Sequence, residues 1–445
     1  MSRKVFISVL GTTFYEESVY GKDDFKSSRT RFIQRATLEW LGAKEWGEED
    51  RVIIATTQEA KEKNWNASIT MRRRKHDGPE EPYTGLETEL KEMRLQARVS
   101  TVDIPNGSNE EEMWEIFRNL FNLFEEDDEL YFDLTHSFRY LPMLVLVLSN
   151  YAKFLRNVKI RSITYGNYEA GKQNGISPII DLLPLTALQD WTFAIADYLQ
   201  NGNIERLNKE ALLAIRPIQK QVYMSGEDKE LLQEIKELRC VICSLTDVVQ
   251  EWETCRGVNV INSKSMAKLK KHLELVNTND SKLLPMLNPL LKKLENSLLP
   301  FNVETDISNM FAAAEWCITN QQYQAAITFL EEGVISFFCL RHGIRLDDET
   351  RRGLVNSAIF RLQEEEEDNT QNYSEEDYET INSLMEDEIL CNQKFLNIYN
   401  EICKIRNDYN HCGMRSIKNR PMAPTTIMDN IGRYIKELKE FLLDN

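Results

Sequence analysis

The alternation of short apolar runs with helical patterns in the first 185 residues is the feature that most limits how this chain can fold. Runs rich in β-branched residues predict strands. These strands are predicted at 4–10, 51–55, 98–104, 129–133, 159–165 and 177–183. Asn109 is placed to cap an amphipathic helix that follows it, and an apolar helix is predicted from about Tyr140 to Leu155. Strand–helix alternation of this kind predicts a mostly parallel sheet with crossover helices, a Rossmann-like α/β layer structure.

After Leu185 the strand signals stop, and the rest of the chain has helical spacing. Pro285, Pro289 and Pro300 interrupt the helical pattern and mark the expected boundary between two helical parts. The sequence therefore predicts an α/β domain over 1–185, an all-α middle segment over 186–300 and an all-α C-terminal domain over 301–445.

The acidic side chains are concentrated in one segment. The chain has 54 basic and 71 acidic side chains, a formal net charge of −17. Residues 363–393 contain no Lys or Arg and hold twelve of the acids, so the remainder carries a net charge of only −5. The segment is therefore interpreted as a solvated loop or insertion. The global acidity excludes tight, unspecific, salt-driven binding of nucleic acid.

The location predicted from the sequence is the cytoplasm. No apolar run reaches the roughly 18–20 residues of a membrane span, and the start of the chain shows no cleavage site for a leader. The eight cysteines do not form a disulfide pattern. Cys240 and Cys243 form a lone CxxC without a second pair or a histidine nearby in the sequence. A buried helical pair is predicted there, with zinc or redox chemistry as the alternative, and no metal site is predicted.

Two basic clusters remain open to interpretation. One lies between Asp23 and Arg35, and the other is Arg72 to Lys75, within a poorly periodic stretch from about Asn64 to Thr84. A mobile surface loop is one interpretation of the second cluster, and contact with an anionic ligand is the other.

The first candidate site joins the fourth predicted strand to the apolar helix. Thr135, His136, Ser137, Phe138 and Arg139 occupy this turn. In an open parallel sheet, ligands bind beyond the carboxyl ends of the strands, and a helix beginning there directs its free N–H groups at the crevice.

The turn Gly11-Thr12-Thr13 after the first strand is expected on the same edge of the sheet. The alternative is a structural turn with a hydrogen-bonded His136. The turn is not GxGxxG, which disfavours a dinucleotide-binding oxidoreductase.

The second candidate site is Arg406-Asn407-x3-His411. The preceding apolar residues step by three and four, so the motif is predicted at the end of a helix that Gly413 terminates. Histidine can move the proton of a 2′-hydroxyl, and arginine can hold the adjacent phosphate, which suits metal-free RNA cleavage. The two side chains stand about 140° apart around an ideal helix, so two copies meeting at a two-fold axis suit the chemistry better than one. A solvated Arg and His at a helix end is the alternative.

Taken together, these features resemble the CRISPR-associated CARF–HEPN ribonucleases of type III systems. The segments 7–13, 133–139 and 165–169 look like CARF elements, 185–202 looks like the segment that follows them, and Arg406-Asn407-x3-His411 matches the HEPN R-x4-6-H motif. Both ends of the chain match in the expected order.

The resemblance implies a Rossmann-like CARF domain that binds a cyclic oligoadenylate and switches on a HEPN domain that cuts single-stranded RNA without a metal, leaving a 2′,3′-cyclic phosphate. It implies Arg406 and His411 as catalytic residues supported by Asn407. The implied ligand-binding residues are Gly11, Thr12, Thr13, Thr135, His136, Ser137, Phe138 and Arg139. It further implies a homodimer, or a higher oligomer, and no catalytic cofactor.

Four matters stay open at this point. The acidic segment 363–393 is interpreted as a disordered insertion, which is favoured, and an acidic wall that repels RNA until activation is the alternative. The activator is expected to be cyclic tetra-adenylate rather than hexa-adenylate. The CARF domain of such proteins sometimes degrades its own activator, and the sequence does not show whether this one does. A non-catalytic oligoadenylate sensor, whose helical part serves only for interaction or regulation, is the alternative function.

Overall fold

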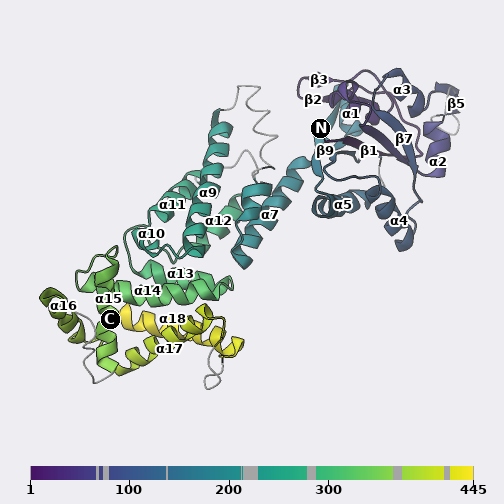
Figure 1. Cartoon of the computed structure of the whole chain (residues 1–445). Helices are drawn as coiled ribbons and strands as arrows, with labels where there is room; N and C mark the ends of the chain where they lie inside the picture. Colours follow the sequence, from purple (N-terminus) through teal and green to yellow (C-terminus); the bar gives the residue numbers. More distant parts are fainter. Residues whose placement is uncertain are drawn as a thin grey trace. The chain divides into compact units, whose positions relative to one another are not determined.

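The computed structural model describes residues 2–66, 70–73, 80–136, 139–211, 213, 229–277, 287–363, 373–414 and 421–443. The chain divides into two compact units, Met1–Thr186 and Ala187–Asn445. Figure 1 shows the first in purple to blue, with its sheet, and the second in teal to yellow, with its helices. An α/β sheet domain followed by a largely helical region confirms the coarse fold prediction.

An eight-stranded mixed sheet forms the centre of the first unit, in the order β3-β2-β10-β9-β8-β1-β4-β7. The strands are β1 (Lys4–Leu10), β2 (Tyr20–Lys22), β3 (Phe25–Lys26), β4 (Arg51–Thr56), β7 (Arg98–Asp103), β8 (Glu129–Asp133), β9 (Lys159–Gly166) and β10 (Ser177–Asp181). The five strands from β7 to β9 are all parallel to their neighbours. β10 runs antiparallel to β9, so the sheet is parallel at its centre and mixed at one edge.

Alternating side chains of β1 pack on opposite faces of this sheet. Val5, Ile7 and Val9 belong to one hydrophobic cluster with α4 (Glu110–Phe121) and α5 (Leu141–Arg156). Phe6 and Leu10 belong to another cluster, with α1 (Ile33–Trp40) and α3 (Leu86–Glu92). A strand covered on both faces is apolar throughout, which is why 4–10 is readable as a strand from sequence.

The capping prediction for α4 is confirmed. The Asn109 side chain accepts a hydrogen bond from the backbone N–H of Glu112 at 2.9 Å. The strands β2 and β3 and the hairpin of β5 (Thr70–Arg73) and β6 (Glu80–Tyr83) were not predicted. They are only two to four residues long, and such short runs show little periodicity.

The second unit is built from helices. They are α7 (Leu183–Asn201, which begins in the first unit), η3 (Leu207–Ala211), α9 (Lys229–Glu253), α10 (Gly257–Asn262), α11 (Lys264–Asn277), α12 (Asn288–Ser297), α13 (Ser308–Thr319), α14 (Tyr323–Arg341), α15 (Glu349–Gln363), α16 (Glu375–Met385), α17 (Gln393–Asn410) and α18 (Pro424–Leu442). Their buried side chains form one continuous cluster from Ala187 to Leu442. The expected division near residue 300 stays a prediction.

Helix α14 is long and apolar enough to cross a membrane by length and composition. Its most apolar window is 61% buried inside the protein. The helix carries Glu331 and Glu332 and packs against α13, α15 and α17. We therefore describe it as the central helix of the C-terminal core.

The disordered-insertion prediction for 363–393 is wrong for the described part of that segment. Residues 375–385 form α16, which opens with a capping box between Ser374 and Asp377. The helix buries Ile381 and Leu384 in the core. Asp387 anchors the next turn by accepting hydrogen bonds from Arg341 Nε at 2.6 Å and from the backbone N–H of Ile389 at 2.9 Å. The run of acids from Glu364 to Asp368 lies outside the described residues.

Candidate functional sites

The loops after β1 and β8 meet at the carboxyl edge of the sheet. These two strands are neighbours in the sheet. From β1 the strand order continues to β4 and β7 on one side, and β8 and β9 follow on the other side. Ligands of parallel α/β sheets bind where the strand order reverses in this way. The N–H of Gly11 donates to Tyr15 Oη at 2.9 Å, and the Tyr15 ring stacks on His136 with centroids 4.0 Å apart. We call the place where Gly11, Tyr15 and His136 meet the β1–β8 crevice.

Gly11 cannot be replaced without moving this contact. A Cβ at this position would lie 2.7 Å from Tyr15 Oη and 3.6 Å from the carbonyl oxygen of His136. The glycine therefore permits the close approach of the two loops.

His136 lies in the crevice with a buried ring nitrogen. Its Nε2 is covered and has no hydrogen-bond partner among the described residues. Burial lowers the pKa of the imidazole to about 4, so the ring is neutral at pH 7. Leaving a buried polar atom unpaired costs about 1–3 kcal/mol, and such atoms call for a ligand or water. The alternative left open by the sequence, a structural turn with a hydrogen-bonded His136, finds no partner for this nitrogen in the described part of the chain.

Thr135 is held inside the domain. Its hydroxyl donates to Asp133 Oδ1 at 2.6 Å and accepts from the N–H of Gly166 at 2.7 Å, so β8 and β9 are tied together. Ser8 Oγ donates to the other Asp133 oxygen at 2.7 Å. Burial raises the pKa of Asp133 to about 6, although both hydroxyl donors oppose the shift. The described bonds commit Thr135 to positioning the loop.

Asn64 is a residue that the sequence reasoning missed. It lies fully buried in η2 (Lys61–Trp65), a π-helical turn. Its Nδ2 donates to the carbonyl oxygens of Gly11 at 2.7 Å and Thr13 at 2.9 Å, which fixes the loop after β1. Within that loop Thr12 is half-buried and Thr13 exposed. A single Asn in a polar stretch gives no signal, because its partner loop is 53 residues away.

Arg72 is anchored beside this loop. Its Nη1 donates to Asn64 Oδ1 at 2.6 Å, and its guanidinium lies 4.3 Å from the centroid of the Tyr83 ring. Arg31 lies 5.3 Å from the same ring, on the same aromatic pair of Phe14 and Tyr83. The mobile-loop interpretation is therefore wrong for Arg72, whereas residues 74–79 lie outside the described residues.

Helix α5 begins just beyond the crevice. Its first residue is Leu141, with Pro142 in the first turn, where a missing N–H costs little. Arg139 is exposed, and within the described ranges it makes no hydrogen bond or ion pair. Ser137 and Phe138, both predicted as ligand-binding residues, lie outside the described residues.

The second candidate site is at the C-terminus of α17, as predicted. The helix ends at Asn410, His411 is its C-cap residue, and Gly413 has a φ of +66°. The N–H of Gly413 donates to the carbonyl oxygen of Asp408 at 2.8 Å, which closes the helix end. The apolar face runs from Phe395 to Tyr409, whereas Cys412 is exposed, so the predicted stripe stops one step earlier.

The three motif residues differ in exposure. Asn407 and His411 are exposed, and the Arg406 side chain is 36% exposed. Arg406 Nε lies 3.0 Å from Oε2 of Glu331, an ion pair that links α17 to α14. The Glu331 side chain is only 12% exposed, and burial raises its pKa although Arg406 opposes the shift. The sequence did not reveal Glu331 as the partner of Arg406.

Comparison with known proteins bears on the first site directly. Residues 5–169 match the family described as CRISPR system endoribonuclease Csx1, CARF domain. Over these residues the chain is similar to a CARF domain. The match includes both loops of the β1–β8 crevice.

A curated relative points the same way. The CRISPR-associated protein MJ1674 of Methanocaldococcus jannaschii is 23% identical over 241 residues, which cover 53% of this chain and 33% of that protein. The alignment thus spans about a third of the relative's length. Both comparisons support a CARF-containing CRISPR protein. The Arg406–His411 motif lies beyond the residues that match the CARF family.

Proposed function

We propose that this protein is an endoribonuclease of type III CRISPR defence, activated by a cyclic oligoadenylate and acting on single-stranded RNA without a metal. The match of residues 5–169 to a CARF domain carries the proposal, since a CARF domain is an oligoadenylate-sensing module. The Arg406–Asn407–His411 motif, exposed at the end of α17, supports the catalytic part.

The β1–β8 crevice suits an anionic nucleotide. Arg139 brings an exposed positive charge to the start of α5, whose first-turn N–H groups favour phosphate. The covered Nε2 of His136 supplies a neutral hydrogen-bonding atom beside the two loops of the crevice. A neutral imidazole there can bind a ribose hydroxyl or a base edge without competing for the phosphates.

A second copy of the chain is the proposed dimer partner, at the exposed face of α5. Met143, Val147, Tyr151, Phe154 and Leu155 share this face, and Phe154 is 88% exposed. Contiguous exposed apolar side chains of this kind mark interaction surfaces. The helix starts at the crevice, and a ring of four or six adenylates has two-fold symmetry, so an isologous dimer would present two equal crevices to one ring.

The proposed reaction is an internal transfer within the RNA. The 2′-oxygen forms a bond to the adjacent phosphorus, and the bond from phosphorus to the 5′-oxygen breaks, so a 2′,3′-cyclic phosphate and a 5′-hydroxyl result. His411 moves a proton at these oxygens, and Arg406 stabilises the growing phosphate charge. Asn407, exposed on the same helix end, orients the RNA backbone by hydrogen bonding.

The ion pair with Glu331 limits how Arg406 takes part. Its Nε faces Glu331, and no hydrogen bond of its two terminal nitrogens is found in the described part of the chain. We infer that these nitrogens hold the phosphate while Glu331 fixes the guanidinium plane.

The test is cleavage of single-stranded RNA by purified protein with cyclic tri-, tetra- and hexa-adenylate, with and without chelator. We expect cleavage only with one ring size, tetra-adenylate being favoured, and no loss in chelator. Recovery of the ring from the same tubes shows whether the CARF domain degrades it. Cleavage that needs no ligand, or that needs added metal, would overturn the mechanism.

A non-catalytic oligoadenylate sensor is the second candidate function. The observation that favours it is the Arg406–Glu331 ion pair, which gives Arg406 a structural reason to be present. Under this function the protein binds the ring but cuts no RNA, and Arg406→Ala changes stability alone.

A further inference from the structure

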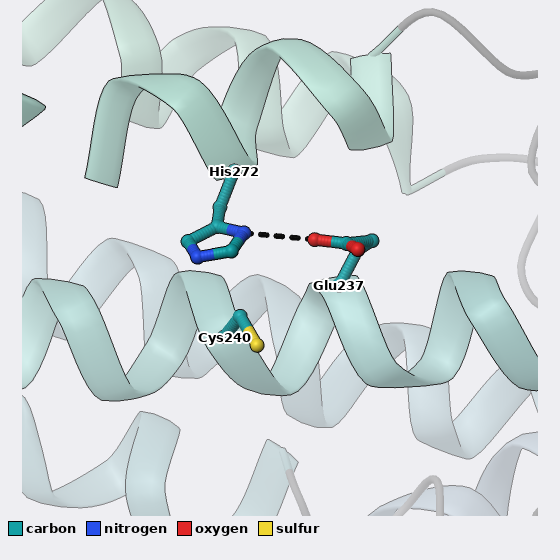
Figure 2. Close-up of side chains that lie close together, drawn as sticks. All are labelled: Glu237, Cys240 and His272. Carbon is teal, nitrogen blue, oxygen red and sulfur yellow. Dashed lines mark hydrogen bonds and ion pairs between the residues drawn. The ribbon is translucent and has the colours of Figure 1, made fainter. Parts of the chain in front are cut away.

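Three side chains of metal-ligating types meet between α9 and α11. Glu237 and Cys240 come from α9, and His272 comes from α11; their ligand atoms all lie within 4.8 Å of one another. His272 Nδ1 lies 2.8 Å from Glu237 Oε2, and Figure 2 shows the Cys240 sulfur beneath this pair. This brings a histidine to the CxxC motif, which has none nearby in the sequence.

Packing of the two helices fixes this arrangement. Leu238 and Val241 of α9 lie in the same buried cluster as Leu269 and Leu273 of α11. Glu237 and Cys240 are i,i+3 neighbours, so they lie side by side on α9 at the border of that buried face. The Glu237 and His272 side chains are only 14% and 19% exposed. The burial predicted for the cysteine pair is wrong, because Cys240 is half-buried and Cys243 is exposed.

We propose that Glu237, Cys240 and His272 bind a zinc ion that clamps α9 to α11. Thiolate, imidazole and carboxylate together are ligands of zinc, and calcium or magnesium would favour oxygen ligands alone. With zinc–ligand bonds of about 2.0–2.3 Å in tetrahedral geometry, ligand atoms stand roughly 3.3–3.6 Å apart. The observed atoms lie within 4.8 Å of one another, so the cluster reaches this spacing after a small opening of the His272–Glu237 hydrogen bond and a side-chain adjustment of Cys240.

The protons balance without any further reactant. Zinc takes the place of the hydrogen between His272 Nδ1 and Glu237, so the neutral imidazole carries its proton on Nε2. The Cys240 thiol releases its proton to solvent. The fourth position holds water. A surface groove lined by Cys243, Lys236 and Lys268 borders the cluster at Cys240. A clamp between two helices stabilises the folded unit, and it takes no part in the proposed RNA cleavage.

The test is metal binding by the full chain, without activator or RNA. The chain is purified with zinc, dialysed and assayed for metal content, and cobalt(II) is titrated as a spectroscopic probe. We expect about one zinc per chain and a sulfur-to-cobalt charge-transfer band. Cys240→Ser and His272→Gln should weaken binding by at least about 10-fold, since even outer-shell changes cost 10–100-fold.

Cys243→Ser is the matched control, because it removes an exposed thiol one turn further along the same helix. It should bind zinc as the wild type does. Binding unchanged in Cys240→Ser, or no zinc bound by the wild type, would overturn the proposal. Equal losses in Cys240→Ser and Cys243→Ser would assign the metal to the two cysteines and overturn it as well.

Thermal unfolding supplies a second measurement. Chelator should lower the unfolding temperature of the wild type and of Cys243→Ser, and it should leave that of Cys240→Ser unchanged, because zinc bound only to the folded state stabilises it. An equal effect of chelator on Cys240→Ser would contradict the clamp.

Discussion

Two histidines lie at the two candidate sites, in opposite surroundings. His136 lies in the β1–β8 crevice with its Nε2 covered, and burial lowers its pKa to about 4. His411 is exposed at the end of α17. A histidine held neutral in a crevice suits recognition of a ligand, whereas one open to solvent at a helix end can exchange protons with a bound substrate.

The two arginines of these sites differ in a related way. Arg139 at the crevice is exposed and without a partner in the described ranges, and Arg406 is bound to a nearly buried carboxylate. A free arginine adapts to whichever anion arrives, and a fixed one offers a single geometry. Among the described residues, the first unit therefore leaves the cation of Arg139 unpaired, whereas the second unit pairs the cation of Arg406 with Glu331.

The largest expected effect separates the two histidines. His411→Ala should reduce RNA cleavage by about 10²–10⁴-fold at saturating activator, because it removes the group that moves the proton. His136→Phe keeps the stacking on Tyr15 and should raise the activator concentration needed, with the maximal cleavage rate unchanged. Initial rates across an activator titration measure both. Cleavage retained in His411→Ala would make the helical unit non-catalytic.

Arg406→Ala should lower cleavage by about 10²–10³-fold, since a donor to the growing phosphate charge is lost. It should also lower the free energy of unfolding by about 1 kcal/mol, as expected for a partly exposed ion pair. Arg341→Ala is the matched control, because Arg341 Nε also pairs with a buried carboxylate, that of Asp387, at 2.6 Å. The control should lose comparable stability and keep cleavage. Equal loss of cleavage in both variants would show that Arg406 contributes to stability and not to catalysis.

The pH dependence of stability tests the burial of His136 and Asp133. The folded-state pKa of His136 is lowered to about 4, so the unfolded state binds more protons below pH 6.5. Falling pH between 6.5 and 4 should cost the wild type up to about 3 kcal/mol relative to His136→Phe. Denaturant midpoints of the two proteins, followed by tryptophan fluorescence, measure the difference.

The raised pKa of Asp133 should make the stability depend on pH in the opposite direction. Its folded-state pKa is raised to about 6, so the native state binds more protons between pH 4 and 6. Rising pH over this window should cost the wild type up to about 3 kcal/mol relative to Asp133→Asn. If the free energies of unfolding of the wild type and Asp133→Asn changed equally with pH, Asp133 would not be buried as described.

The smallest expected effect concerns the loop after β1. Gly11→Ala places a Cβ 2.7 Å from Tyr15 Oη, so the Tyr15–His136 stack must shift. We expect activator binding to weaken by about 10-fold, that is by about 1.4 kcal/mol. Gly47→Ala is the control, because nothing lies within 4 Å of a Cβ at that position. Calorimetric titration with the activating ring measures the affinity of both variants. Equal affinities would contradict a role of Gly11 in activator binding.

Much of the first unit was predictable because its signals are local. Lys4–Leu10 is apolar on both faces of a covered sheet, and Asn109 stands directly before the helix it caps. The end of α17 was predictable for the same reason. Apolar residues such as Ile402 and Ile405 follow helical spacing, and Gly413 with its positive φ stands where the helix ends. By contrast, α16 was missed because its acids dominate the composition, while its few apolar residues, such as Ile381 and Leu384, decide its burial.

The sequence by itself determined the six longer strands of the sheet, the two loops beside the sheet edge and the position of the Arg406–His411 motif, because each depends on neighbours along the chain. Only the tertiary structure decided which residues far along the chain contact the residues of these sites. Asn64 reaches Gly11 across 53 residues, and His272 reaches Glu237 across 35. Glu331 likewise meets Arg406 from another helix. Such pairings follow from helix and sheet packing, which a local pattern of residues does not encode.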